Sequence, residues 1–259
     1  MSDLKLSSLI TVSIVSHGHG ELVDELLLDI NKYCNTSILK IVLTNNIDDA
    51  YQLRHNAGLD VTYIRNEVPK GFGENHNQAF DLCDTQWFVI LNPDIRLKDD
   101  IFSLLVNRYQ GSDVALVAPV VLNQNEGFED SVRKNLTLYS LLQRSLGNEK
   151  LVSGVSRVVQ GETRFYWFAG MFLFVRSEEF RYIGGFNQRF FLYCEDYDLC
   201  ARMYVNGLVM TRDSELSVLH DARRDSHRSL KFLTWHIASL LRVWTSFVFW
   251  KLLFSKKTP

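Results

Sequence analysis

Apolar and polar residues alternate in blocks along the first half of the chain. Five short apolar runs, rich in β-branched residues, are separated by segments in which Leu and Ile recur at helical spacing. The apolar runs cover residues 9–16, 38–44, 61–65, 87–91 and 114–121, and the helical segments cover 22–33, a stretch ending near 56, 74–83 and 99–109. Because the runs show no internal polar alternation and are separated by helices, the pattern predicts a parallel sheet covered by helices on both faces. Functional sites of such sheets form at the carboxyl ends of the strands.

The second half of the chain is less regular. Residues 123–165 show no clear periodicity apart from a helix near 138–146. Beyond them the pattern predicts an apolar strand at 167–175, a helix at 195–205, short strands at 208–211 and 216–220, and a helix from 226 to about 254. The helix at 195–205 begins with acidic residues and ends at Asn206-Gly207, which is a good C-terminal stop.

Composition narrows the class of protein. The chain has 259 residues, of which 46% are hydrophobic and 22% charged. These values are typical of a globular protein with one large or two small domains, and they exclude a disordered or collagen-like chain. The net charge of −2 argues against an overall nucleic-acid binder.

The cysteines and the N-terminal segment bear on the compartment. Four cysteines in 259 residues, without a CxxC pair, are too sparse for a disulfide scaffold and favour a reducing cytosol. The N-terminal segment lacks a basic start followed by an apolar stretch, so we expect a first strand there rather than a signal peptide. No run of 18 apolar residues is free of charge, and we therefore expect no spanning helix.

Basic residues concentrate near the C-terminal end. Residues 223–257 carry eight basic residues and one acid, a net charge of +7, whereas the preceding 222 residues carry −9. Seven aromatic residues are interleaved with them: Phe232, Trp235, Trp244, Phe247, Phe249, Trp250 and Phe254. This mixture suits a membrane interface, and it also suits a helix packed on the core or a homodimer interface. No reader motif accompanies the basic patch, so we expect no nucleic-acid partner.

Two candidate metal ligands follow predicted strands. Asn92-Pro93-Asp94 comes directly after the apolar run at 87–91. A carboxylate at the end of a buried strand can hold a divalent metal and, through it, a diphosphate, although Asn-Pro-Asp is equally good turn chemistry. His220 also follows a short strand. A lone His in this position is more often a packed or exposed residue than a ligand. The alternative interpretation is a site that His220 shares with Asp94, since both follow strands.

An acidic cluster begins the helix at 195–205. Glu195, Asp196 and Asp198 repel one another unless cations or exposed amides compensate. Asp198 and Arg202 stand four residues apart, so we expect a structural ion pair between them. Glu195 or Asp196 is then left for general-base work, and an N-terminal capping cluster is the alternative.

Residues 71–77 read GFGENHN. Two glycines before a helix can bring backbone amides close to a ligand. The segment lacks the third glycine of a dinucleotide fingerprint and the Lys of a phosphate loop. An ordinary helix start is therefore the plainer interpretation.

Taken in order, these motifs resemble the inverting nucleotide-sugar glycosyltransferases of family 2, and within it the rhamnosyltransferase-like members that build bacterial surface polysaccharide such as O-antigen. The resemblance covers about 210 residues. The matching segments are VSIVSHG at the first strand, Asn66 with GFG at 71–73, NPD at 92–94, WFAGMF at 167–172, GGFN at 184–187, FFLYCEDYDLCAR at 190–202, Gly207 and His220. The run from GGFN to the downstream His is the most specific piece.

The resemblance implies a GT-A fold, an α/β architecture with a mostly parallel central sheet flanked by helices. It implies a catalytic domain at 1–225, with a nucleotide-sugar-binding half to about 122 and an acceptor-binding half at 123–225, followed by a basic aromatic helical tail at 226–259. Asp196 matches the catalytic base, with Glu195 beside it, and Asp94 and His220 match ligands of Mg²⁺ or Mn²⁺. The expected donor-binding residues are Ser16, Asn45, Asn46, Asn66, Gly71, Asn77 and Asn92.

The sequence departs from the family pattern at two informative positions. Asn92 replaces the first Asp of the metal motif, which leaves fewer charged ligands. Thr44 stands where the family often has an Asp that reads the nucleotide base. Base recognition therefore differs, or Asn45 and Asn46 take it over.

The expected activity is transfer of a sugar, with L-rhamnose from dTDP-rhamnose as the best choice, to a hydroxyl of a polyprenyl-diphosphate-linked sugar. The expected place is the cytoplasmic face of the inner membrane, with the tail on the membrane surface. A nucleotidyltransferase would instead show a Lys- or Arg-containing loop after the first strand, which SHGHG lacks. A non-catalytic module that binds nucleotide sugars would keep the fold without turnover, and a scaffold that associates through its tail would bind neither donor nor metal.

Overall fold

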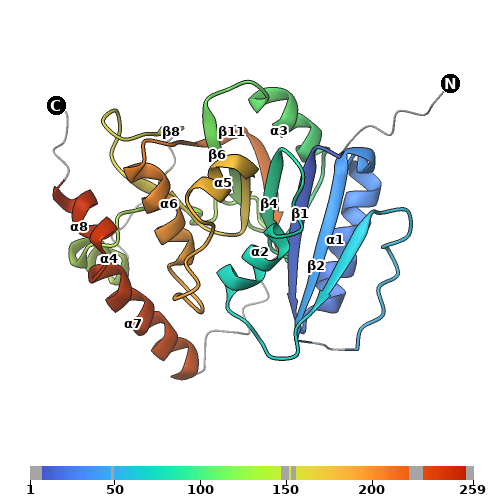
Figure 1. The fold of residues 1–259 in the computed structure, drawn as a ribbon, viewed down its shortest axis with the longest axis horizontal. Helices are drawn as coiled ribbons and strands as arrows, with labels where there is room; N and C mark the ends of the chain where they lie inside the picture. The colour runs from blue at the N-terminus through green and yellow to red at the C-terminus, as the bar shows by residue number, and fades with distance from the viewer. Residues whose placement is uncertain (1–7, 48–49, 147–151, 153–155, 222–229, 255–259) are drawn as a thin grey trace.

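The computed structural model describes residues 8–47, 50–146, 152, 156–221 and 230–254 (Figure 1). Its strands are β1 (Ile10–His17), β2 (Leu39–Ile47), β3 (Val61–Arg65), β4 (Trp87–Leu91), β5 (Ile95–Arg96), β6 (Val114–Leu122), β7 (Val132–Lys134), β8 (Arg157–Val158), β9 (Tyr166–Phe168), β10 (Phe172–Arg176) and β11 (Val209–His220). Its helices are α1 (Gly20–Tyr33), the 3-10 turn η1 (Thr36–Ile38), α2 (Phe72–Phe80), α3 (Ile101–Tyr109), α4 (Leu138–Ser145), α5 (Ser177–Tyr182), α6 (Glu195–Val205), α7 (Leu230–Trp244) and α8 (Phe247–Phe254).

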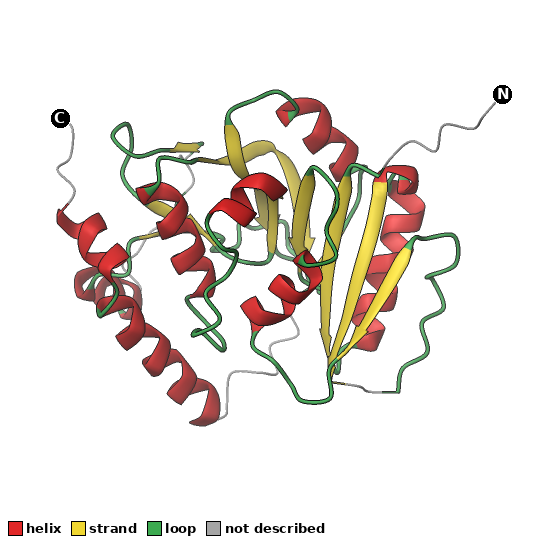
Figure 2. Cartoon of the chain, in the orientation of Figure 1, coloured by secondary structure: helices red, strands yellow, loops and turns green. Residues whose placement is uncertain are grey.

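One large sheet runs through the centre of the molecule (Figure 2). Its main path is β3-β2-β1-β4-β10-β6-β11-β5, and β8 pairs with β11 beside that path. Strands β1 to β4 pair in parallel with one another, and β6 pairs in parallel with β11. Ile14 on β1 lies opposite Leu43 on β2 and Leu91 on β4, so the carboxyl ends of three strands meet at one edge. A separate pair of short strands, β7 and β9, lies off this sheet.

The alternation of side chains along β4 shows how the two faces are covered. Trp87, Val89 and Leu91 pack in a core with residues of α1 and α3, whereas Phe88 and Ile90 pack with residues of α2, α5 and α6. All five side chains are fully buried. A strand covered on both faces has no solvent side, which explains why the sequence shows an unbroken apolar run there.

Most predicted elements are present, and the GT-A arrangement of a mixed sheet between helices is confirmed by the comparisons below. The central sheet is mostly parallel, as expected, and β10 runs antiparallel between β4 and β6. The helical stretch predicted to end near 56 is wrong, because described residues 50–60 form no helix. The two short strands predicted at 208–211 and 216–220 are one strand, β11, whose register against β6 shifts between Asp213 and Ser217.

The C-terminal segment forms two helices rather than one. Helix α7 ends at Trp244 and α8 begins at Phe247, and both lie with α4 at the end of the molecule opposite α1 (Figure 1). No single helix in the described part of the chain is long and apolar enough to cross a membrane. Only the pair α7 and α8 passes that test together, by length and composition, and it bends by 58° at the break. Residues 226–229 of the predicted helix lie outside the described residues.

Candidate active site

A cavity of about 860 Å³ opens at the carboxyl ends of β1, β2 and β4. Its lining includes residues 17–20 after β1, Asn46 of β2 and residues 92–94 after β4. Helix α7 contributes Phe232 and Trp235. We call it the strand-end cavity. It lies where a doubly covered sheet of this kind places its ligands.

Asp94 and His220 are far apart in the sequence, and the sheet brings them together. Asp94 follows β4, and His220 ends β11, where it lies opposite Ile95 of β5. His220 Nε2 lies 3.2 Å from Asp94 Oδ2. Burial lowers the pKa of His220, but the hydrogen bond and the charge of Asp94 outweigh burial, so the net shift of this pKa is upward.

Two atoms of this pair have the character of metal ligands. Asp94 Oδ1 and His220 Nδ1 are buried and have no hydrogen-bond partner among the described residues. A buried carboxylate oxygen without a partner costs free energy unless a cation or a donor reaches it. One carboxylate and one imidazole suit Mg²⁺ or Mn²⁺ that keeps water and phosphate oxygens as its other ligands. In the described part of the chain no group of three or more His, Cys, Asp or Glu side chains surrounds such a point, so the pair supplies only part of a coordination shell.

Asn46, Asn66 and Asn75 form one hydrogen-bonded chain beside the strand-end cavity. Asn66 Nδ2 donates to Asn46 Oδ1 over 2.8 Å and to Asn75 Oδ1 over 2.7 Å. Asn46 also accepts from the backbone N–H of Lys70 and donates to its carbonyl oxygen. Asn46 and Asn75 line the cavity. The chain of amides therefore holds the loop before α2 in place and forms part of the cavity wall.

A smaller cavity of about 270 Å³ lies on the α1 face of β1 and β2 and is lined by Ser16, Asn45 and Arg65, among others. Tyr51 lines both this cavity and the strand-end cavity, so the two adjoin. Thr44 is fully buried, and its hydroxyl has no partner among the described residues. Because successive side chains of a strand alternate between faces, Asn45 reaches this cavity and Thr44 does not.

Gly71 and Asn77 join α2 to the second half of the chain. A Cβ on Gly71 would lie 2.6 Å from the carbonyl oxygen of Phe191, so only glycine allows this approach. Asn77 donates to the carbonyl oxygen of Phe186 and accepts from its N–H, both over 2.8 Å. Asn77 lines a separate cavity of about 560 Å³. In this structure the two residues contact protein rather than the strand-end cavity.

The acidic cluster lies at the start of α6 behind a strained turn. Tyr193 and Cys194, directly before α6, have φ values of 71° and 63°, a left-handed conformation that non-glycine residues adopt only when their surroundings impose it. Asp196 Oδ2 accepts from the N–H of Gly170 over 3.1 Å, and Oδ1 accepts from the N–H of Tyr197 over 2.8 Å. The turn and the two backbone donors fix the direction of this carboxylate.

Glu195 and Asp196 are adjacent carboxylates in different surroundings. Burial raises the pKa of both groups, and the charge of Asp196 raises that of Glu195 further. Glu195 Oε2 is buried without a partner in the described chain. At Asp196 the charge of Arg133 and the two backbone donors oppose the effect of burial. The pKa of both carboxyl groups is therefore raised, and at Asp196 the rise is opposed by Arg133 and the backbone donors.

Asp196 faces a second cavity, of about 410 Å³, which we call the α6 cavity. Glu195, Asp196 and Trp167 line it together with two arginines, Arg133 and Arg144. Phe232 of α7 lines both this cavity and the strand-end cavity. The two cavities therefore share a wall.

The structural ion pair predicted in α6 is confirmed. Arg202 Nε lies 2.7 Å from Asp198 Oδ2. The same guanidinium donates to the carbonyl oxygens of Ile183 and Gly185, each over 2.7 Å. Arg202 thus ties α6 and Asp198 to the glycine turn of the GGFN segment, whereas Glu195 and Asp196 line the α6 cavity.

Gly170 and Arg133, which the sequence analysis did not name as site residues, also shape the site. Gly170 donates to Asp196, and a Cβ there would lie 3.1 Å from Cζ of Phe72, which lines the strand-end cavity. Gly170 falls inside the matched WFAGMF segment, which was the available signal. Arg133 lies in the stretch without periodicity, and nothing in the sequence pattern pointed to it.

Comparison with known proteins identifies the class of enzyme to which this fold belongs. The model of glycosyl transferase family 2 matches residues 14–203. The chain belongs to this family, and it is a glycosyltransferase.

Curated relatives include rhamnosyltransferases. The chain is 30% identical over 255 residues to rhamnosyltransferase WbbL of Escherichia coli K12, covering 90% of this chain and 92% of that protein. It is 24% identical over 164 residues to the N-acetylglucosaminyl-diphospho-decaprenol L-rhamnosyltransferase of Mycobacterium tuberculosis H37Rv, covering 60% of this chain and 53% of that protein. Within family 2 the chain is therefore rhamnosyltransferase-like, of the kind that acts in polysaccharide synthesis.

Solved structures show the same fold. The mannosyltransferase PcManGT from Pyrobaculum calidifontis, in complex with GDP-Man and Mn²⁺, superposes with a TM-score of 0.63 at 15% identity, over 91% of this chain and 65% of that chain. TarS 1–349 of S. aureus in complex with UDP-GlcNAc superposes with a TM-score of 0.62 at 13% identity, over 85% of this chain and 60% of that chain. At these identities the likeness establishes the GT-A fold alone.

Proposed function

We propose that this glycosyltransferase moves L-rhamnose, with inversion, from dTDP-rhamnose to a hydroxyl of a polyprenyl-diphosphate-linked sugar during synthesis of a cell-surface polysaccharide. The observation that carries the proposal is the pairing of two sites across one wall. Asp94 and His220 lie at the strand-end cavity, and the oriented carboxylate of Asp196 lies in the cavity on the other side of Phe232. Transfer of a sugar from a nucleotide to an acceptor requires these two chemistries side by side.

The donor occupies the strand-end cavity and its smaller neighbour. The nucleotide base binds in the smaller cavity with Ser16 and Asn45, and the diphosphate lies toward Asn92 and Asp94. Asp94 and His220 would hold Mg²⁺ or Mn²⁺, whose charge offsets the negative charge that develops on the departing nucleoside diphosphate. The relatives and the Mn²⁺ complex of a structural neighbour support this assignment.

The remaining donor-side residues act through the loop before α2. Asn46 and Asn66 hold that loop through their amides, and Gly71 and Asn77 fix α2 against the second half of the chain. We assign these four residues to positioning the donor cavity.

Asp196 acts as the general base. Its carboxylate takes the proton of the acceptor hydroxyl, and the hydroxyl oxygen attacks the anomeric carbon from the face opposite the diphosphate. The bond from the anomeric carbon to the phosphate oxygen breaks, and the electron pair leaves with the diphosphate. One displacement inverts the configuration and needs no covalent enzyme intermediate. Burial raises the pKa of Glu195 well above its usual range, which disfavours a second negative charge beside the base.

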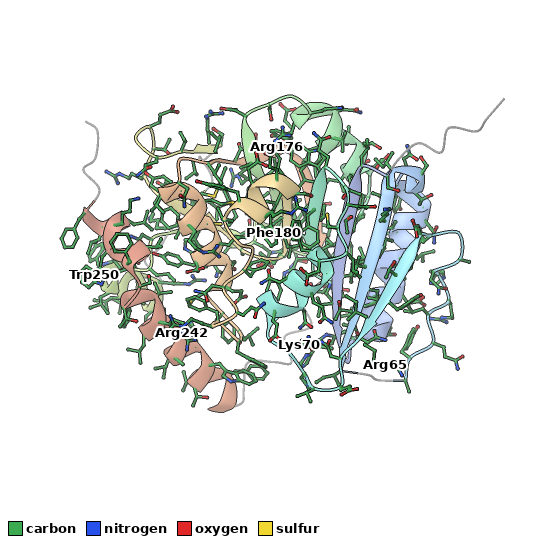
Figure 3. The ribbon with its side chains drawn as sticks, viewed as in Figure 1. Arg65, Lys70, Arg176, Phe180, Arg242 and Trp250 are labelled. Carbon is green, nitrogen blue, oxygen red and sulfur yellow. The ribbon has the colours of Figure 1, made fainter. Side chains whose placement is uncertain are left out.

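Exposed apolar side chains on α4, α7 and α8 form one end of the molecule, which we call the apolar end surface. They are Leu138, Tyr139, Leu142, Leu233, Ile237, Leu241, Phe247, Trp250, Leu253 and Phe254. Arg242 and Lys251 come from the same helices, and Figure 3 shows Arg242 and Trp250 at this end, opposite Arg65. Apolar patches of this extent mark interaction surfaces. We assign this one to an anionic bilayer at the cytoplasmic face of the inner membrane, since Leu233 also lines the α6 cavity that would receive a lipid-linked acceptor.

We further propose the division into a catalytic domain at 1–225 and a membrane-surface tail at 226–259. Within the catalytic domain, residues 1–122 form the donor half and 123–225 the acceptor half. β10 and β11 of the second half lie in the sheet of the first, which supports two halves of one domain rather than two domains.

The test is a panel of nucleotide sugars with the purified protein. Binding and slow donor hydrolysis are measured with Mg²⁺, with Mn²⁺ and with EDTA, followed by transfer to a prenyl-diphosphate-linked N-acetylglucosamine. Metal-dependent binding of dTDP-rhamnose and an inverted product support the proposal. Binding of a different donor replaces the sugar in the proposal, and binding without turnover on any acceptor would refute the catalytic assignment.

A further inference from the structure

We propose that Arg133 and Arg144 bind the phosphate group that links the acceptor sugar to its lipid. This inference rests on the proposed function and extends it from the reacting hydroxyl to the rest of the acceptor. It assigns the α6 cavity to a substrate with three parts: a sugar beside Asp196, a phosphate or diphosphate at the two arginines, and a hydrocarbon chain that leaves over the apolar end surface.

The first observation is the way the two guanidinium groups are held. Arg133 is on β7 and Arg144 is on α4, yet both bind the same carboxylate oxygen, Asp130 Oδ2. Arg133 Nε donates to that oxygen over 3.0 Å, and its guanidinium stacks 5.0 Å from the ring centre of Trp167. Asp130 lines a different cavity, whereas both arginines and Trp167 line the α6 cavity. The carboxylate therefore fixes two cations from behind and leaves them presented to the cavity.

The second observation is the charge of the cavity wall. The ionisable side chains that line the cavity are Arg133, Arg144, Tyr193, Cys194, Glu195, Asp196 and His236. Burial raises the pKa of Tyr193 and of Cys194, which favours their neutral forms. Burial lowers the pKa of His236, and the charges of Arg144 and Arg133 lower it further, so His236 is neutral. Burial raises the pKa of Glu195 well above its usual range. Two guanidinium groups thus line the cavity, with Asp130 paired to them from outside its lining, and planar guanidinium groups match phosphate oxygens in pairs.

The third observation is the set of surfaces that meet at the cavity. Leu136, Leu141 and Leu233 supply apolar lining beside Asp196 and the two arginines. Leu233 continues the exposed row of Ile237 and Leu241 on α7, one helical turn apart each. A phosphate on the anomeric carbon of a sugar lies only a few bonds from the hydroxyl that reacts. A base, two cations and an apolar surface at one cavity match the three parts of an amphiphilic acceptor.

The test compares two acceptor probes that differ only in phosphate. One is farnesyl-diphosphate-linked N-acetylglucosamine, and the other is farnesyl N-acetylglucosaminide. Dissociation constants are measured by calorimetry without donor, and KM and kcat are measured with donor. The variants are Arg144→Gln, which changes an exposed side chain, and Arg133→Lys, which keeps the charge but loses the planar fork. Arg157→Gln is the matched control, because Arg157 of β8 pairs with the exposed Asp113 and lines neither cavity.

For the wild type we expect tighter binding of the diphosphate probe. Arg144→Gln should weaken binding of that probe by about tenfold or more, because a charge-assisted hydrogen bond is lost, and should leave the phosphate-free probe unchanged. Arg133→Lys should show a smaller selective loss, and Arg157→Gln should keep the wild-type preference. Equal losses on both probes, or no loss on either, would overturn the inference.

Two further results distinguish this inference from binding of bilayer headgroups and from the proposed sugar transfer itself. If Arg144→Gln loses binding to phosphatidylglycerol vesicles but keeps its preference for the diphosphate probe, the arginines bind bilayer headgroups and the inference fails. A second outcome is a wild type that binds a nucleotide sugar and transfers with equal efficiency to the phosphate-free probe and to the diphosphate probe. That result would support the proposed transfer and refute only the phosphate site. A wild type that binds no nucleotide sugar and transfers to neither probe would refute both.

Discussion

The strand-end cavity and the α6 cavity share Phe232 as a wall, but their carboxylates are prepared in opposite ways. Asp94 keeps one oxygen buried without a partner among the described residues and places the other against His220. Asp196 has both oxygens bound by backbone N–H groups at the start of a helix. In the first arrangement a buried carboxylate oxygen has no partner among the described residues, and a bound cation would stabilise it. The second fixes direction while burial raises the proton affinity.

This difference teaches how one fold separates two tasks of the same functional group. A metal ligand must stay ionised and reachable by the ion, whereas a base must gain and lose a proton at one defined place. The neighbours decide the role: an imidazole at Asp94, and a buried second carboxylate with an arginine at Asp196.

The largest expected effect separates the base from the donor site. Asp196→Asn removes proton acceptance and keeps the size of the side chain and one of its two backbone hydrogen bonds, because the amide nitrogen cannot accept from the second N–H. We expect kcat to fall by about 10³-fold, within the range of general-base removal, while the donor dissociation constant stays within about twofold. Rates and donor titrations measure this, with Asp113→Asn, an exposed ion-paired carboxylate, as the matched control. Retention of wild-type kcat would remove Asp196 from the role of base.

The converse change addresses the donor site. Asp94→Asn weakens the charge that a cation would bind, so we expect kcat/KM to fall by about 100-fold and donor affinity to lose its dependence on Mn²⁺. Donor titrations with Mn²⁺ and with EDTA measure this, and Asp84→Asn, a surface partner of Lys40, serves as the control. If EDTA still weakens donor binding in the Asp94 variant, the metal binds elsewhere.

Removing part of the apolar end surface should affect only the acceptor side. The double change Ile237→Ser and Leu241→Ser exposes no new core, because both side chains are about half exposed already. We expect vesicle binding and the KM for a vesicle-borne acceptor to worsen by about tenfold, with the donor dissociation constant unchanged. Leu104→Ser on α3 is the control. A change from dimer to monomer in the double variant, without loss of vesicle binding, would assign the surface to a homodimer.

A smaller effect should couple the two sites. Gly170→Ala places a methyl group 3.1 Å from Cζ of Phe72, which then shifts toward the strand-end cavity. We expect about a fivefold loss of kcat/KM, mostly through the donor KM, because small displacements of a positioned group are costly. Adding Phe72→Leu should recover part of the loss by restoring space. Failure of that second change to recover any donor affinity would contradict the proposed contact.

The smallest effect is on stability and depends on pH. Folding raises the pKa of Glu195, so the folded chain keeps a proton that the unfolded chain releases above about pH 4.3, and wild-type stability falls as pH rises from there toward the raised pKa. Glu195→Gln has no such proton. From pH 5 to pH 8 its Tm should therefore rise relative to wild type by a few degrees, roughly 2–4 °C for each kcal/mol.

Thermal melts across that pH range measure this effect. Glu162→Gln, an exposed carboxylate, is the control that should leave the pH dependence unchanged. Parallel melting curves for wild type and Glu195→Gln would mean that Glu195 is ionised in the folded protein.

Local pattern was sufficient for much of the fold. The buried strands β1, β4 and β6 and the helices α3, α4 and α6 follow from apolar runs and helical spacing, because each depends on interactions within a few residues. The helix predicted to end near residue 56 is absent, because the conformation of this segment depends on long-range contacts rather than on local spacing. The segment is held by long-range contacts to Asp24, which accepts hydrogen bonds from the backbone N–H groups of Arg54 and His55.

The same distinction between local pattern and long-range contacts applies to the candidate site. The sequence by itself determined the residue types and their order: a carboxylate after β4, an acidic pair at the start of α6, a His after a late strand. Only the tertiary structure decided that His220 meets Asp94, that Thr44 is turned into the core while Asn45 faces a cavity, and that Arg133 and Arg144 share Asp130 beside Asp196. Spacing along a strand or helix depends on nearby residues and can be recognised in the sequence. The insertion of antiparallel β10 and the pairing of β11 with β5 bring together residues more than 100 positions apart. Those pairings depend on burial of the whole sheet, which local sequence does not encode.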